Sequence, residues 1–206
     1  MFFCLIQPVL TYAESDSNGF SENVKSFNKI TYDAARQNWC VSSSPNGFTY
    51  FANHQGLLEF DGTTWNLYRL PNETILRAVK VQNDSVIYTS GYMELGYWKP
   101  DNFGKLHYFS LTEKAKKHLF KNIEFWNIAV TDSFVYFQSF NRIVAYHADS
   151  VSVINLPPFI SVMNKVNDKV LVAQRDTGIF EITGESIKPF LTGDFFKNKL
   201  VQFLIP

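Results

Sequence analysis

The sequence predicts an all-β fold, a β-propeller whose blades are four-stranded antiparallel sheets. Three observations support this prediction: short apolar runs bounded by turn residues, a repeat near 40 residues, and a high content of aromatic side chains. Of the 206 residues, 17% are aromatic, including 20 Phe and 10 Tyr, and such side chains favour strands over helices. A repeat of about 40 residues with four strands in each unit is typical of propeller blades.

The stretch NHQGLLEFDGTTWNLYRLP, residues 53–71, shows part of one unit. Two apolar runs flank Asp61 and Gly62, and these residue types tolerate the positive φ angles that tight hairpin turns need. A single hairpin is only marginally stable in water, so this one is expected to be the outer half of a larger sheet. Trp65 is expected to pack against a neighbouring blade.

Sixteen apolar runs form four groups of four expected strands. They lie at 39–43, 48–52, 57–61, 65–70, 76–81, 86–90, 94–98, 106–111, 126–131, 134–138, 143–147, 151–156, 160–166, 170–173, 178–182 and 187–191. In the third strand of each group, one register position holds Phe60, Tyr97, Tyr146 and Ile182, with steps of 37, 49 and 36 residues. The long step contains residues 112–122, which are rich in helix formers and predict a single helical insertion.

The predicted propeller covers residues 38–206. Its blades are expected at 38–70, 76–111, 125–156 and 160–191, with the first strand of a fifth blade from residue 200. Four blades and one strand do not close a ring, so we expect an incomplete ring that is a fragment of a larger propeller; a closed four-bladed ring is the alternative.

An open arc leaves one flank of its last blade uncovered. Side chains on that flank would be exposed, and residues 14–206 are expected to be aggregation-prone or partly unfolded when expressed on their own. The side chains expected to lose their cover are Val170, Leu171, Ile179 and Phe180.

The first residues are typical of a secretory signal. An apolar run at 2–10 is followed by Thr11-Tyr12-Ala13, with small residues at the positions that a signal peptidase reads. Residues 1–13 are therefore predicted to be a signal peptide, shortened at its start because a basic segment is missing, and 14–37 a polar lead-in. A buried first strand is the alternative, although Pro8 would interrupt it. No apolar run approaches the ~20 residues of a membrane span, and export is the prediction.

Composition and motifs exclude several functions. Lys and Arg together number 19, as do Asp and Glu, so no overall charge recruits nucleic acid. Removal of the signal would leave Cys40 as a single cysteine, which is expected to be a buried structural thiol. The four histidines have no metal-ligand spacing, and no nucleotide-binding or nucleophile motif occurs. We predict no catalytic residue, no metal and no cofactor.

The phrases NWCVSSSPNGFTYFANHQGLLEFDGTTWNLYRLPNETILRAVKV and SGYMELGYW, within residues 38–99, resemble a bacterial family of sensor-regulators with two-component-regulator propellers and a triple-tyrosine domain. The resemblance implies an exported sensor on the periplasmic face of a membrane-anchored protein. In the family, a membrane helix leads to a histidine kinase or to a LuxR-type DNA-binding domain. Those parts are not in this sequence, so kinase and DNA-binding activities are not assigned to it. The implied partners are the remainder of the same polypeptide and, in a full-length protein, a second copy.

The turns between the second and third strands of the blades are the candidate ligand site. In a propeller these turns and the links between blades share one face, around the mouth of the channel. Aromatic rings there can stack on a sugar, and polar side chains can bind its hydroxyls or a carboxylate. The candidates for a glycan or other small ligand are His54, Gln55, Tyr92, Phe140, Asn141, Arg175 and Asp176. The tryptophans, in contrast, are expected to be blade-packing core: Trp39, Trp65, Trp98 and Trp126.

Two other functions stay open. One is a carbohydrate-active hydrolase or lyase on a propeller scaffold, and the other is a structural platform for protein interactions. The stretch EFDGTTW resembles the Asp-box of sialidase-like propellers, but Glu59 takes the place of its Ser or Thr, and Asp61 and Gly62 are adjacent. Two suitably placed carboxylates cannot be singled out, so the prediction for this chain is a non-enzyme.

Overall fold

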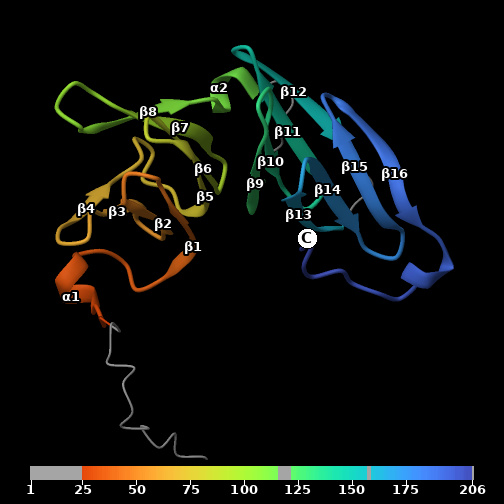
Figure 1. Ribbon diagram of the computed structural model, residues 1–206, viewed down its shortest axis with the longest axis horizontal. Helices are drawn as coiled ribbons and strands as arrows, with labels where there is room; N and C mark the ends of the chain where they lie inside the picture. Colours follow the sequence, from red (N-terminus) through yellow and green to blue (C-terminus); the bar gives the residue numbers. More distant parts are fainter. Residues whose placement is uncertain (1–24, 116–121, 157–158, 206) are drawn as a thin grey trace, which may run out of the picture.

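The computed structural model describes residues 25–115, 122–156 and 159–205, and its four antiparallel sheets confirm the predicted fold class (Figure 1). In each sheet, four strands pair in chain order, as in a propeller blade. The first blade contains β1 (Asn38–Ser43), β2 (Thr49–Asn53), β3 (Gly56–Phe60) and β4 (Trp65–Tyr68). The second contains β5 (Leu76–Asn83), β6 (Val86–Gly91), β7 (Leu95–Pro100) and β8 (Leu106–Ser110). The third contains β9 (Asn127–Val130), β10 (Val135–Gln138), β11 (Arg142–His147) and β12 (Ser150–Asn155). The fourth contains β13 (Ile160–Val166), β14 (Lys169–Gln174), β15 (Gly178–Thr183) and β16 (Ser186–Thr192).

Helices are short within the described residues. They are α1 (Lys29–Tyr32), α2 (Thr112–Ala115) and one 3₁₀ turn (Asp194–Phe196). The predicted helical insertion at 112–122 begins as α2, and its residues 116–121 lie outside the described part of the chain.

The predicted signal peptide, residues 1–13, also lies outside the described residues. Within the described ranges, no helix combines the length and the apolar character that a membrane span requires.

The predicted turn at Asp61 and Gly62 is present between β3 and β4. The Asp61 carboxylate accepts hydrogen bonds from the backbone N–H groups of Thr63 (2.7 Å) and Thr64 (2.6 Å), and these bonds lower the pKa of Asp61. Gly62 has a φ of 97°, in the left-handed region that favours glycine. The local sequence therefore determines the turn that joins β3 to β4 in the first blade.

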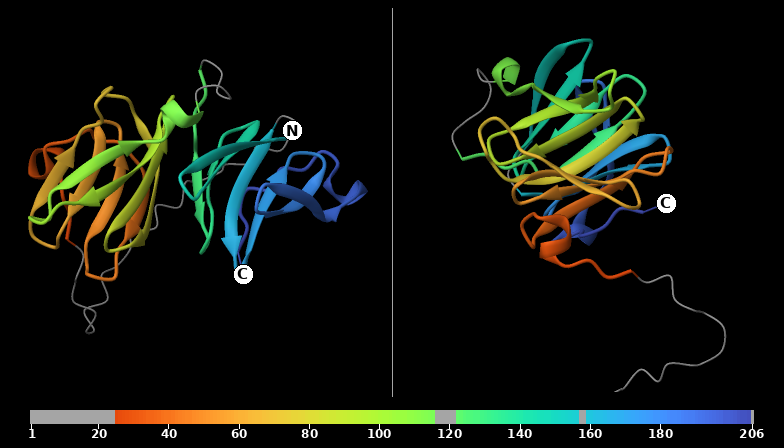
Figure 2. Two further views of the ribbon diagram at one scale, coloured as in Figure 1. Left: turned by 90° about the horizontal axis from the view of Figure 1, so that it is seen from above. Right: turned by 90° about the vertical axis from the view of Figure 1, so that its left-hand side faces the viewer.

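The four sheets stand side by side in an open arc and do not close a ring (Figure 2). The innermost strands β1, β5, β9 and β13 follow one another around the axis of the arc. Apolar side chains fill each space between neighbouring blades. Buried examples, in order along the arc, are Leu57 with Trp98, Leu95 with Phe137, and Ile143 with Val172. The closed four-bladed ring is therefore wrong.

A central cavity of about 430 Å³ lies among the innermost strands and residues 202–205. Cys40, which lines it from β1, is half-buried rather than fully buried, and its thiol lies 3.4 Å from the carbonyl oxygen of Val79. This contact across the first two blades supports a structural role for the thiol.

The expected first strand of a fifth blade, from residue 200, is not a strand. A strand needs a ladder of hydrogen bonds with a neighbouring strand, and the segment lies against β14 through side chains instead. Leu204 packs with Leu171 and Ala173, and the amide of Asn164 donates to the Leu204 carbonyl oxygen at 2.9 Å.

The four side chains of the fourth blade that were expected to be uncovered are in fact covered, two of them by this segment. Val170 and Leu171 are 2% and 6% exposed. Val170 and Phe180 pack toward the third blade, so that neighbour covers them. Leu171 and Ile179 face the other way and are covered by Leu204 and its neighbour Val201. The expected aggregation of residues 14–206 stays a prediction.

Two of the four tryptophans show how differently the aromatic side chains are used. Trp98 is 2% exposed between the first two blades, and its indole N–H donates to the Thr89 hydroxyl at 2.9 Å, as expected for a core residue. The ring contacts of Trp65 among the described residues are with its own blade and with the segment before it, and not with a neighbouring blade. It stacks on Phe60 (4.3 Å between centroids) and meets Phe27 (5.1 Å), so the chain before the first blade covers it instead.

Candidate functional site

The turns between second and third strands lie beside the links between blades, as the sequence predicts. The Tyr92 N–H donates to the carbonyl oxygen of Ile75, which precedes β5. The Ile160 N–H, at the start of β13, donates to the carbonyl oxygen of Phe140. Backbone hydrogen bonds therefore hold turns and links together on one face of the arc.

A cavity of about 260 Å³ opens on this face, at the third blade. It lies among the link before β9, the β10–β11 turn and the link before β13. Its lining residues are Asn122, Ile123, Glu124, Ser139, Phe140, Asn141 and Phe159. Two of the predicted site residues, Phe140 and Asn141, therefore line one cavity.

A third predicted residue, Tyr92, lies at the rim of this cavity. Its hydroxyl donates to the Asn122 side-chain oxygen at 2.9 Å, and its backbone forms an isolated β-bridge with Glu124. The neighbouring Met93 N–H donates to the Ile123 carbonyl oxygen at 2.9 Å. The turn of the second blade thus fixes the link that forms one wall of the cavity.

Arg77 on β5 connects this wall to two tryptophans. Its Nη2 lies 3.0 Å from Glu124 Oε1, and its guanidinium lies 3.9 Å from the Trp39 ring centroid and 4.8 Å from that of Trp126. The Trp126 ring is in turn 5.7 Å from that of Phe140. This arrangement joins the first three blades at the channel mouth, by an ion pair and by cation–π contacts.

Trp39 is 38% exposed, so the expectation that it is core is wrong. It lies on the innermost strand, where one ring face meets Arg77 and its edge meets Trp126. The half-buried Trp126 likewise packs on Arg77 and Phe140 at the channel mouth rather than inside a blade interface. Both tryptophans therefore lie on the face that carries the turns and the links between blades.

The chemistry of this face is aromatic and weakly polar. Phe140 and Phe159 are 56% and 62% exposed, and Tyr92 is 38% exposed. Amide groups of Asn122 and Asn141 supply donors and acceptors beside these rings. Exposed rings with a few polar groups around a concave site are suited to stacking on a ring-shaped ligand whose hydroxyls are hydrogen-bonded. In the described part of the chain, no three metal-ligating side chains form a cluster.

The other four predicted site residues do not join this cavity. His54 and Gln55 lie in the first blade's turn, where the His54 N–H donates to the carbonyl oxygen of Gln37. Arg175 and Asp176 lie in the fourth blade's turn and pair with each other at 3.7 Å. The Arg175 N–H nevertheless donates to the carbonyl oxygen of Phe159 at 3.0 Å, so the fourth blade's turn is bound to the link that lines the cavity, although its side chains are not among the lining residues.

Sequence reasoning missed Asn122, Glu124 and Phe159, which lie on links between blades. The shared face of turns and links was the available signal, but no local pattern tells which link residue faces the cavity. No local sequence pattern indicates that Arg77 belongs to the site, because its neighbours Trp39 and Glu124 are far from it in sequence.

Comparison with solved structures supports the propeller fold. The extracellular domain of the hybrid two-component system BT3049 from B. thetaiotaomicron is similar at a TM-score of 0.60 and 16% identity, over 82% of this chain and 27% of that chain. That of BT4673 from the same organism gives 0.55 and 12%, over 73% and 21%. Virginiamycin B lyase from Staphylococcus aureus gives 0.57 and 14%, over 73% and 54%.

This chain spans about a quarter of these sensor domains and about half of the lyase. No protein-family model matches the sequence, and no curated protein matches it.

Proposed function

We propose that this chain is the N-terminal part of an exported, ligand-sensing propeller of a bacterial signal-transduction regulator. The observation that carries the proposal is the cavity at the third blade, which is lined by the exposed Phe140 and Phe159 together with Asn122 and Asn141. The fold that the chain shares with extracellular domains of two-component systems supports the sensing role. In this proposal, the signal passes to an output domain in the remainder of the polypeptide.

The proposed ligand is a short glycan. A cavity of about 260 Å³ is close to the ~300 Å³ lower end of small-molecule pockets, so it suits one sugar ring, with further rings lying over the exposed aromatic side chains. The apolar face of a sugar stacks on Phe140 or Phe159. Its hydroxyls are hydrogen-bonded by Asn141 and by the Glu124 carboxylate, which Arg77 holds in place.

Hydrolysis is less well supported than binding. Glycoside hydrolysis uses two carboxyl groups on either side of the scissile bond. Among the described residues that line the cavity, Glu124 is the only carboxylate, and it is paired with Arg77. The enzyme alternative would gain support if the complete gene product turned over a glycan and Glu124→Gln abolished that turnover.

The test is calorimetric titration of a panel of oligosaccharides into the protein and two variants. We expect Phe140→Ala to weaken the binding of a recognised oligosaccharide about tenfold, because a stacking surface is lost. The matched control is His54→Ala, which changes the equivalent turn of the first blade and should leave affinity unchanged.

Equal weakening by both variants would contradict this site. Failure of every oligosaccharide to bind, together with stable capture of a protein partner, would support the interaction-platform alternative. Retention of the mature protein in the cytoplasm on fractionation would remove the case for an exported sensor.

A further inference from the structure

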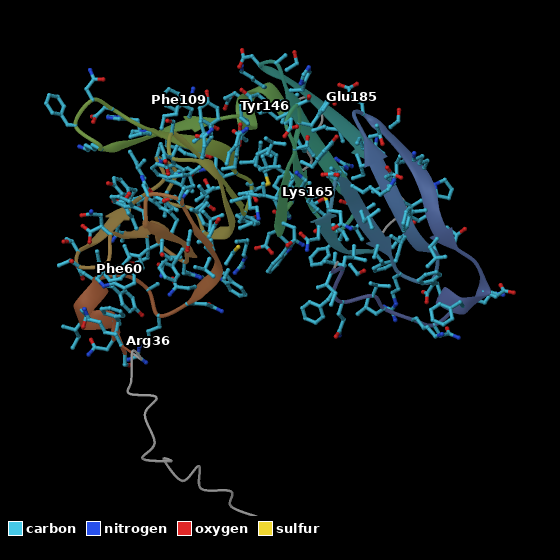
Figure 3. All side chains as sticks on the ribbon, in the orientation of Figure 1. Arg36, Phe60, Phe109, Tyr146, Lys165 and Glu185 are labelled. Atoms are coloured by element: carbon cyan, nitrogen blue, oxygen red, sulfur yellow. The ribbon has the colours of Figure 1, made fainter. Side chains whose placement is uncertain are left out.

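The β7–β8 hairpin of the second blade carries the most exposed large apolar side chain of the described residues. Phe103, at its tip, is 96% exposed. The hairpin projects at the outer rim of the arc, away from the channel mouth and the cavity of the third blade (Figure 1). Phe109 on β8, labelled in Figure 3, is also exposed, at 45%.

The tip is held in one conformation by its own hydrogen bonds. The Asp101 carboxylate accepts from the backbone N–H groups of Phe103 (2.9 Å) and Lys105 (3.0 Å), and its other oxygen lies 2.9 Å from His107 Nε2. The Gly104 N–H donates to the Asp101 carbonyl oxygen, and its φ of 83° suits glycine. The turn therefore presents Phe103 to solvent without the entropic cost of ordering a flexible loop on binding.

Two lysines lie on the same hairpin as Phe103, Lys99 near the end of β7 and Lys105 just before β8. Lys99 and Lys105 are exposed, and neither forms a salt bridge within the described part of the chain. The negative charge of Asp101 is engaged by His107 and the turn N–H groups, which lower its pKa. The tip thus combines an apolar side chain with two lysines and one carboxylate, which leaves a net positive charge, and the Lys99 ammonium lies 5.3 Å from the Tyr97 ring centroid.

We propose that this hairpin docks on an anionic lipid surface, with Phe103 inserted at the boundary of headgroups and acyl chains and the two lysines against lipid phosphates. Aromatic and basic side chains together are typical of membrane interfaces, whereas lysine is depleted in the cores of protein–protein interfaces. The chain has no net charge, so the attraction is local and acts within about 10 Å at ordinary salt. The inference is independent of the ligand proposed for the third blade.

The test uses the local environment of residue 103. The whole chain carrying Phe103→Trp is mixed with vesicles of two parts phosphatidylcholine to one part phosphatidylglycerol, with brominated acyl chains. We expect the additional tryptophan emission, relative to the parent protein, to shift to the blue and to be quenched. The matched control is Phe203→Trp, because Phe203 is 79% exposed in a distant part of the chain, and its added emission should be unaffected.

Vesicle flotation then tests each side chain. Phe103→Ser should weaken binding about tenfold or more, and Lys99→Gln with Lys105→Gln should weaken it about tenfold. Quenching at residue 103 reports on the hairpin alone, so vesicle binding by the apolar residues 2–10 does not obscure it. Absence of quenching at residue 103, equal quenching at 203, or equal binding to phosphatidylcholine vesicles without phosphatidylglycerol would each overturn the proposal.

Discussion

The second and fourth blades have the same topology, but their surroundings differ. The second lies between two other blades, and its two outer strands, β7 and β8, contain three buried residues and one buried residue. In the described part of the chain, the fourth has a blade on one side and residues 199–205 on the other. Its strand β14 is as buried as β6, with five of six residues, but its outer strands β15 and β16 contain two buried residues and none. A blade is thus completed by its neighbours, and the middle of the arc is also where the candidate cavity lies.

Buried polar groups show the same difference. In the second blade, the buried Glu94 carboxylate accepts hydrogen bonds from four side chains: Asn72, Tyr108, Ser110 and Thr112. In the fourth blade, the described partners of the partly buried Glu181 carboxylate are the exposed Lys169 and Lys188. Exposed pairs contribute little to stability, whereas a buried and fully bonded carboxylate holds several segments together.

The largest expected effect comes from the core between the first two blades. Trp98→Ala should lower the free energy of unfolding by about 3–5 kcal/mol, because it leaves a large cavity and an unpaired Thr89 hydroxyl. The control is Phe190→Ala on β16, where the side chain is half-exposed, with an expected change within about 0.5 kcal/mol. Urea denaturation measures both changes. Equal losses of unfolding free energy in the two variants would contradict the difference between the second and fourth blades.

A somewhat smaller effect is expected from the carboxylate of the second blade. Glu94→Ala leaves its donors without an acceptor in a buried site, and should lower the free energy of unfolding by about 3 kcal/mol. Glu185→Ala, on the exposed β15–β16 turn, should leave the melting temperature unchanged. If Glu94→Ala melted like the parent protein, the network would have no structural role.

The fold was accessible from sequence because its signals are local. The turn at Asp61 and Gly62 and the period of the third strands depend on residues close together in the chain, and both are confirmed. The segment from residue 200 has no strand pairing among the described residues, and there is a physical reason for this. An apolar run shows that a segment will be buried, but only a neighbouring strand can give it a ladder of hydrogen bonds.

Only part of the candidate site could be predicted from the sequence. Phe140 and Asn141 were found because short turns on a rigid scaffold are good candidates. The exposure of Trp39 could not be foreseen, because it depends on Arg77 and Trp126 from two other blades. His54 and Arg175 matched the same local pattern as Phe140, but they are not among the residues that line the cavity at the third blade.

A third prediction concerns alkaline pH and blades that contain tyrosine. Burial, followed by the nearby Glu59, raises the pKa of Tyr68 to about 12 from 10.0. The folded state thus favours the neutral phenol, so this stabilisation is complete below pH 10 and is lost as the pH rises to about 12. Burial raises the pKa of Tyr146 to about 12 as well.

The fourth blade contains no tyrosine, so alkaline destabilisation should begin in the first three blades. Denaturation midpoints between pH 9 and pH 12 should fall, and Tyr68→Phe should make that fall shallower. A midpoint independent of pH in this window would contradict the buried, neutral state of Tyr68.

Hydrogen exchange of the native protein, followed by mass spectrometry of peptides from each blade, tests the central claim most directly. We predict that amides of the outer strands β7 and β8 exchange more slowly than those of β15 and β16, because the outer strands of the fourth blade lose the least buried contact when they open locally. Equal protection of the second and fourth blades would contradict the claim that neighbouring blades set the stability of each blade.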